Sequence, residues 1–366
     1  MITRYPKGVA ILSVVALVLV FSVVVQAFLV SNAPGSGPNQ GAGTGTVTPE
    51  PQPSAEVPTQ TPIPPTPLPT ATSTPSPTPT PTYAGTFKNA FGHQPVAVMI
   101  DNFPDARPQS GLSRADIVYE AVVEGGITRF MAIFGNSDAE VVGPVRSGRH
   151  YFMYWASEHN AVYVLAGASP QGYSAASAIG LPTIDYTYGK GYFWRSRDRD
   201  APHNLYTEIA RLRDSFKDSG NGRLDSLTFK NDSPSPQVRE ITLTHPDKYR
   251  VGFAYREQDN SYERYLLRSP HVDAHSGEQY HPKNVIVQFV RAWLIPGDTA
   301  GRMDMDLVGS GPAYFFLDGT AVKGTWRKAS LTSPTRFLNE NGIDILFNAG
   351  QTWIQVAPTD SKLEYQ

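Results

Sequence analysis

The residues best suited to bind a ligand are a set of arginines in the N-terminal half: Arg107, Arg129, Arg146, Arg149 and Arg195. Arg146 and Arg149 lie in the motif Gly-Pro-Val-Arg-Ser-Gly-Arg, just before an aromatic run that predicts a helix with Ser147 as its N-cap. Free backbone N–H groups at a helix start favour an anion, and guanidinium forks recognise carboxylate or phosphate. The motif therefore predicts an anion-binding site.

Two glutamates in the same region open alternatives to ligand binding. Glu120 and Glu124 are candidate catalytic carboxylates for glycoside hydrolysis, which needs a pair about 5–10 Å apart. Four residues along a strand span roughly 13 Å, so this pair fits only if the chain turns back at Glu124. In the competing interpretation these glutamates, with Asp101 and Asp116, pair with the arginines and only brace the fold. Whether the protein is an enzyme stays open at this stage, and binding is favoured.

His203 and Asn204 form a further polar pair, directly after Pro202. One interpretation is a helix entrance, with Asp200 or Asn204 as the N-cap and Pro202 in the first turn. The other places His203 in a cleft, as a general base or as a hydrogen-bond donor to a ligand. We therefore count His203 among the candidate catalytic residues and both residues among the candidate ligand-binding ones.

Metal chemistry has little support in this sequence. His271, Asp273 and His275 alternate, and in an extended segment their side chains would point the same way, as ligands of a metal do. Pro270 and Gly277 mark the segment as a loop, however, and we expect neither a metal nor a cofactor. The chain contains no cysteine, which rules out thiolate zinc sites, disulfides and cysteine nucleophiles within these residues.

Apolar runs at residues 96–100, 117–123 and 128–134 predict the strands that position this chemistry. Gly125-Gly126 between the last two runs is typical of a two-residue hairpin turn. That turn would place Glu120 and Glu124 on one face with Arg129, within reach of its guanidinium.

The order of predicted elements suggests two parts. Helical patterns are seen at residues 151–159, 171–179 and 205–217, whereas strand-like runs dominate after residue 225, at 250–256, 285–293, 313–317, 321–326 and 352–356. We predict an α+β fold, with an N-terminal mixed α/β lobe at residues 83–230 and a mostly antiparallel β lobe at residues 231–366.

The first 82 residues predict an anchor and a stalk. Arg4 and Lys7 precede an apolar run at residues 9–30, which as a helix of about 33 Å would cross a hydrocarbon core of about 30 Å. We interpret residues 1–30 as a signal-anchor with a cytoplasmic N-terminus, with a cleaved signal peptide as the alternative. Residues 31–82 are rich in Pro and Thr and predict a disordered stalk.

Several segments resemble the YerB-like family. They are Pro-Val-Ala-Val-Met-Ile-Asp-Asn from Pro95, Glu-Gly-Gly-Ile-Thr-Arg-Phe from Glu124, Gly-Pro-Val-Arg-Ser-Gly-Arg from Gly143, and Ala-Pro-His-Asn-Leu-Tyr from Ala201. The resemblance implies a two-part domain of unknown function outside a bacterial membrane, often carried by lipoproteins. It implies no reaction. This chain departs from the lipoprotein pattern because it lacks the lipid-bearing cysteine.

Together these features predict a membrane-anchored, extracytoplasmic binding or accessory protein of a bacterial cell envelope. The expected partner is peptidoglycan or another anionic wall polymer, bound in an arginine-lined cleft. A wall-glycan hydrolase and a protein–protein scaffold are the alternatives. The net charge of -2 gives no reason to expect nucleic acid as a partner.

Overall fold

A computed structural model of the protein describes residues 91–217 and 222–366. The predicted membrane segment at residues 9–30 and the predicted stalk at residues 31–82 lie outside these ranges. Among the described residues, no helix is both long and apolar enough to cross a bilayer.

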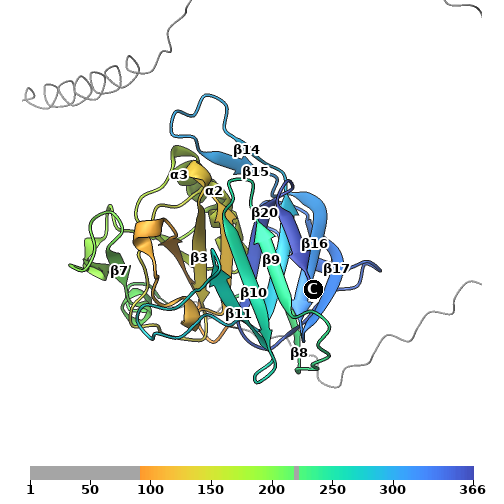
Figure 1. Ribbon diagram of the computed structural model, residues 1–366. Coiled ribbons are helices and arrows are strands. Elements are labelled where there is room, and N and C mark those ends of the chain that lie inside the picture. The colour runs from red at the N-terminus through yellow and green to blue at the C-terminus, as the bar shows by residue number, and fades with distance from the viewer. Residues whose placement is uncertain (1–90, 218–221) are drawn as a thin grey trace, which may run out of the picture. The chain divides into compact units, whose positions relative to one another are not determined.

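A ten-stranded sheet forms the centre of the described structure (Figure 1). In spatial order its strands are β18 (Arg336–Asn339), β17 (Thr320–Lys328), β16 (Gly309–Leu317), β13 (Asn284–Val290), β20 (Thr352–Pro358), β2 (Ile117–Val122), β3 (Thr128–Phe134), β1 (Val96–Asp101), β4 (Val162–Leu165) and β5 (Thr183–Asp185). Apolar and β-branched residues fill these strands and are buried on both faces in the middle of the sheet, as the near-continuous apolar runs require.

The two halves of the chain meet inside this one sheet. Strand β20, close to the C-terminus, lies parallel to β2 on one side and parallel to β13 on the other. Trp353 of β20 is in register with both Val118 and Val285 and is fully buried. The N-terminal and C-terminal halves are therefore joined by backbone hydrogen bonds and by a common core.

A second sheet of five strands covers one face of the first (Figure 1). Its order is β12 (Ser269–Pro270), β11 (Ser261–Leu266), β10 (Arg250–Arg256), β9 (Glu240–Thr244) and β21 (Lys362–Tyr365). Alternate residues such as Val251 and Phe253 point into an apolar core shared with Val98 and Phe130 of the large sheet. The residues between them, such as Gly252 and Ala254, face away from that core.

Helices cover part of the opposite face. Helix α2 (His150–Glu158) and helix α3 (Pro170–Ile179) pack aromatic and small side chains, Trp155 and Ala175 among them, onto the large sheet. Ser169 caps α3 by accepting a hydrogen bond from the backbone N–H of Gly172. Three two-stranded ribbons complete the fold: β6 (Phe193–Arg195) with β7 (Leu205–Thr207), β8 (Thr228–Lys230) with β19 (Leu346–Asn348), and β14 (Ala292–Leu294) with β15 (Met303–Met305).

The predicted fold class is wrong. Strands dominate the described residues taken together, and the helices there are α2, α3 and the short α4 (Ile209–Arg213), besides single 3-10 turns, all in the N-terminal half. The helix predicted at residues 205–217 is mostly absent, because Leu205 belongs to strand β7 and only five residues of that stretch are α-helical. The structure is a mostly β protein built on large sheets.

The predicted hairpin register is also wrong, by one residue. The turn between β2 and β3 is a three-residue 3-10 turn (Glu124–Gly126) in which Gly125 and Gly126 have left-handed φ values of 74° and 68°. Glu120 consequently pairs with Phe130, and Ala121 pairs with Arg129. A shift of one residue moves side chains to the other face of a strand, so Glu120 and Arg129 point in opposite directions.

Candidate functional site

The Glu124 cluster consists of Glu124, Arg129 and Arg149. The Glu124 carboxylate accepts hydrogen bonds from Nε and Nη2 of Arg149, and its Oε1 lies 3.5 Å from Nη2 of Arg129. Both arginine side chains are buried, and they also donate to backbone carbonyls of the loop that enters α2. Burial raises the pKa of Glu124, but the two guanidinium groups outweigh it and lower this pKa to about 2.

The start of α2 differs from the prediction. The N-cap is Arg149, with extended backbone and no side-chain capping bond, whereas Ser147 lies two residues outside the helix. The Ser147 hydroxyl accepts a hydrogen bond from Arg149 Nη1. Arg149 is thus turned back onto Glu124 and the loop, and it does not present its charge at the helix N-terminus.

The Asp101 cluster lies at the same end of the sheet and consists of Asp101, Phe103, Arg146 and His203. Asp101 ends β1, directly opposite Arg129 on β3. Its Oδ2 lies 2.8 Å from His203 Nδ1 and 3.1 Å from Arg146 Nε. Its Oδ1 accepts the backbone N–H of Phe103 at 3.1 Å. One buried carboxylate therefore orients an imidazole and a guanidinium that both reach the surface.

Phe103 fixes the plane of the histidine ring. The two rings stack with centroids 5.0 Å apart and planes 13° apart. With Nδ1 held by Asp101, Nε2 is left as the functional nitrogen of His203, a base when neutral and a donor when protonated. Among the described residues, no hydroxyl hydrogen-bonds to Nε2, so the histidine is not part of a nucleophile–base pair.

The two clusters together carry a surplus positive charge. Three guanidinium groups (Arg129, Arg146 and Arg149) face two carboxylates (Asp101 and Glu124), with His203 in addition. Arg129 and Arg149 are at most 7% exposed, whereas the Arg146 side chain is 30% exposed and that of His203 is 15% exposed. Arg146 is therefore the arginine of these clusters that a ligand can touch, with the His203 ring beside it and the Glu124 carboxylate 25% exposed.

Glu120 is closed to any substrate. Its Oε2 accepts a hydrogen bond from Arg264 Nη2 at 2.5 Å, and its Oε1 accepts from the hydroxyls of Thr128 and Tyr249. Burial raises the pKa of Glu120, but the Arg264 charge and the two hydroxyls lower it by more, so the carboxylate is ionised. This fully buried pair ties β2 to β11 and serves the packing of the two sheets.

The buried network around this pair also determines the state of His271. Arg264 Nη1 lies 2.7 Å from His271 Nδ1, and because an arginine can only donate, Nδ1 must accept. His271 Nε2 then donates to Oε1 of Gln109 at 2.8 Å. Burial, and after it the Arg264 charge, lowers the pKa of His271 well below its ordinary value.

The remaining metal candidates also have structural partners. Asp273 accepts hydrogen bonds from the backbone of Gly111 and from the hydroxyl of Ser113, and it closes its own turn by accepting from the backbone N–H of His275. The His275 side chain is about half exposed and lies 3.8 Å from Glu140. Within the described ranges, no group of three or more His, Asp or Glu side chains is arranged to hold a metal.

The other predicted ligand-binding residues brace loops. Arg107 donates to the side chain and the backbone carbonyl of Asn102. Arg195 donates to the side chain of Asn204, which itself donates to two carbonyls of its own loop. No helix begins at this loop, because residues 200–204 form turns that lead into β7. Asn204 thus shapes the loop that carries His203.

Sequence reasoning missed the two residues that organise these sites. Asp101 was expected only as a partner for an arginine, yet it holds Arg146 and His203 together. Arg264 was not singled out at all, because its partner Glu120 lies 144 positions away and no local pattern links them. The only local signal was Asp101 itself, a carboxylate at the end of a strongly apolar strand.

Comparison with known proteins agrees with this architecture. Residues 83–222 match the family model "Protein of unknown function (DUF3048) N-terminal domain", and residues 241–354 match the corresponding C-terminal domain. "Putative lipoprotein YerB" of Bacillus subtilis is 32% identical over 278 residues, which cover 72% of this chain and 81% of YerB. The chain belongs to the YerB-like family. The expected resemblance is thereby confirmed.

A solved structure of the YerB-like family shows the same fold. The crystal structure of YerB protein from Bacillus subtilis superposes with a TM-score of 0.64 at 28% sequence identity, and the match covers 75% of this chain and 94% of that one. The two family models cover both the segment that holds the Asp101 cluster and the segment that holds strands β10 and β11.

Proposed function

We propose that this protein is an extracytoplasmic binding protein of the bacterial cell envelope, and that Arg146 and His203 bind an anionic group of a wall polymer. The relative's name as a lipoprotein supports a place outside the cytoplasmic membrane. The 366 residues contain no cysteine that could carry a lipid. We therefore propose the apolar run at residues 9–30 as the membrane anchor.

The observation that carries the proposal is an accessible guanidinium and an imidazole that one buried carboxylate holds side by side. Asp101 uses one oxygen to hold both Arg146 and His203, and it is itself inaccessible. Preorganised side chains lose little freedom when an anion binds, and partial burial reduces the screening of the Arg146 charge by salt. A carboxylate or phosphate group between the two side chains would complete the arrangement.

The geometry gives less support to the hydrolase alternative. Glu120 is buried against Arg264, and Glu124 is held ionised by two arginines, so neither carboxylate is placed to protonate a leaving group. Binding needs only the guanidinium donors that Arg146 exposes and the His203 ring beside them.

The test measures binding of the full-length protein in detergent to purified, soluble peptidoglycan fragments. Arg146→Ala and His203→Ala are each expected to weaken binding about tenfold or more, since each removes a charge-assisted hydrogen bond. Arg336→Ala is the matched control, because Arg336 is an exposed arginine paired with Asp344 on a distant edge strand. Wild-type affinity in both cluster variants, with intact melting temperature, would contradict the proposal.

Asp101→Asn separates orientation from charge. This change keeps Arg146 and His203 but removes the carboxylate that aligns them. If the cluster acts through preorganisation, the variant binds more weakly even though the net positive charge of the site has increased. Tighter binding would show that charge alone governs the interaction.

A further inference from the structure

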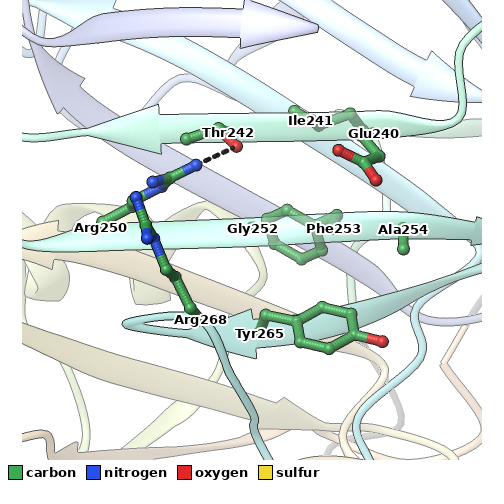
Figure 2. A pocket seen from close by; sticks show the side chains of 9 residues that line it. All are labelled: Glu240, Ile241, Thr242, Arg250, Gly252, Phe253, Ala254, Tyr265 and Arg268. Carbon is green, nitrogen blue, oxygen red and sulfur yellow. Dashed lines mark hydrogen bonds between the residues drawn. The ribbon is translucent and has the colours of Figure 1, made fainter. Parts of the chain in front are cut away.

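The outward face of the five-stranded sheet carries a groove of about 380 Å³, which we call the outer groove. The residues that line it include Glu240, Thr242, Arg250, Gly252, Tyr265 and Arg268, as Figure 2 shows. The volume falls within the range of about 300–1,000 Å³ that is usual for sites of small ligands. This groove is separate from the residues proposed above to bind wall polymer.

A glycine in the central strand creates the groove. Gly252 of β10 is in register with Thr242 of β9 and with Tyr265 of β11, and all three face outward. The side chains of Thr242 and Tyr265 therefore stand on either side of a position that has none. The next outward residue of β10 is Ala254, whose small side chain extends the groove along the strand.

Two arginines meet at one end of this groove without a carboxylate. Figure 2 shows both Arg250 and Arg268 at that end. Arg250 Nη2 donates to the hydroxyl of Thr242 at 3.3 Å and, within residues 91–217 and 222–366, to no carboxylate. Among the described residues, the Arg268 side chain has no hydrogen-bond or ion-pair partner, and the backbone of Arg268 has a left-handed φ of 75° in the turn after β11. Two neighbouring guanidinium groups without a counter-ion favour a bound carboxylate.

The opposite end carries a negative charge. Glu240 is exposed there, in register with Ala254, and it accepts a weak hydrogen bond from the Gln366 side chain at 3.4 Å. From Arg250 to Ala254 the strand advances roughly 13 Å. A second anionic group on the ligand would be repelled by Glu240, whereas an ammonium group would be attracted.

We propose that the outer groove binds a short zwitterionic ligand, its carboxylate on Arg250 and Arg268 and its ammonium group on Glu240. The body of the ligand lies over Gly252 and against the Tyr265 ring. An extended tripeptide with free termini measures roughly 10 Å and spans the groove. This site is independent of the Asp101 cluster, so either proposal can fail without the other.

The test is calorimetric titration of the full-length protein in detergent with Ala-Ala-Ala. Saturable binding is expected below about 10 mM. The same peptide with an amidated C-terminus should bind at least about tenfold more weakly, because it offers no carboxylate to the arginines. The N-acetylated peptide should also bind more weakly, because it offers no ammonium to Glu240. Absence of saturable binding of Ala-Ala-Ala would overturn the proposal.

Two variants locate the binding in the groove. Arg250→Ala combined with Arg268→Ala should lower the affinity at least about tenfold. Gly252→Val fills the groove without touching any charge, and it suits the extended backbone, because an added Cβ meets its nearest atoms at 3.6 Å. This variant should keep its melting temperature and lose binding. Arg336→Ala is the control and should bind as the wild type does.

Each outcome of these titrations either supports or contradicts one part of the proposal. Wild-type affinity in the arginine double variant would overturn the role of the cations, and wild-type affinity in Gly252→Val would place the ligand elsewhere. Equal affinity for Ala-Ala-Ala and its amidated form would show that the groove does not recognise a carboxylate. Loss of binding in both variants, with intact folding, supports the assignment.

Discussion

Glu124→Gln is expected to destabilise the protein strongly at neutral pH and hardly at all near pH 2. The Glu124 carboxylate pairs with two arginines that are almost fully buried, Arg129 and Arg149. Its pKa lies at about 2 instead of the ordinary 4.5. At about 1.4 kcal/mol per pKa unit, this shift corresponds to about 3 kcal/mol of stability. An independent expectation, that removing one partner of a buried ion pair costs about 3–5 kcal/mol, agrees with it.

The sign of the pH dependence follows from the direction of this shift. Because the pKa of Glu124 is lower in the folded protein, the contribution is present in full above pH 4.5 and is lost as the pH falls towards 2. Burial, and after it the Arg149 charge, lowers the pKa of Arg129, but a guanidinium stays protonated throughout this range. The carboxylate is therefore the group of the cluster that titrates.

The assay is urea unfolding of the wild type and of Glu124→Gln at about pH 7 and about pH 2.5. The difference in free energy of unfolding should be about 3 kcal/mol at the higher pH and should shrink to under about 1 kcal/mol at the lower one. Glu257→Gln is the control, because Glu257 and its partner Arg239 are both exposed. A difference that is small at pH 7, or equal at both pH values, would refute the reasoning.

Three further changes test the buried parts of the fold. Glu120→Gln should lower the free energy of unfolding by about 3–5 kcal/mol, because it leaves Arg264 buried without a charge partner. Adding EDTA should leave the melting temperature unchanged. His271→Ala should lower the free energy of unfolding by about 1–3 kcal/mol, because this histidine accepts a hydrogen bond from the buried Arg264. Gly324→Ala should lower the free energy of unfolding by at least about 1–3 kcal/mol, because the added Cβ would lie 2.0 Å from a backbone oxygen of the next strand. Gly191→Ala is its control, because a Cβ added there meets no atom within 4 Å. Urea unfolding measures the free energies, and unchanged curves for the first two variants, or equal effects of the two glycine variants, would contradict these expectations.

The fold was only partly predictable because its decisive pairings are distant in sequence. Strands β1, β2 and β3 could be recognised from their apolar runs, and their bounds agree with the structure to within one residue. No local pattern could show that β20 inserts beside β2, more than 200 positions away, and so unites the predicted lobes in one sheet. The helical spacing of residues 205–217 was partly misleading, because Leu205 is buried by the pairing of β7 with β6, whereas Ile209 and Leu212 are buried on the short helix α4.

The candidate site shows the same division. The sequence alone was enough to identify the arginine-rich motif, the glutamates and His203 as polar residues beside buried strands. Which of them stay accessible depended on the hairpin turn, since one additional turn residue places Glu120 and Arg129 on opposite faces. Of the predicted ligand-binding arginines, Arg129 and Arg149 are buried and donate to Glu124 and to backbone carbonyls, whereas Arg146 stays partly exposed beside His203.

The sequence by itself determined the family, the lack of cysteine chemistry and most of the central strands, because these depend on residue identity and on short-range periodicity. The tertiary structure alone decided that Asp101 collects an arginine and a histidine, that Glu120 is paired with Arg264, and that Gly252 opens a groove. Asp101 and Glu120 meet partners from distant positions in the chain, and the groove depends on how β9, β10 and β11 pair within one sheet. Burial then sets their charge states and hydrogen bonds, because an ionised group in an apolar core is stable only beside its partner.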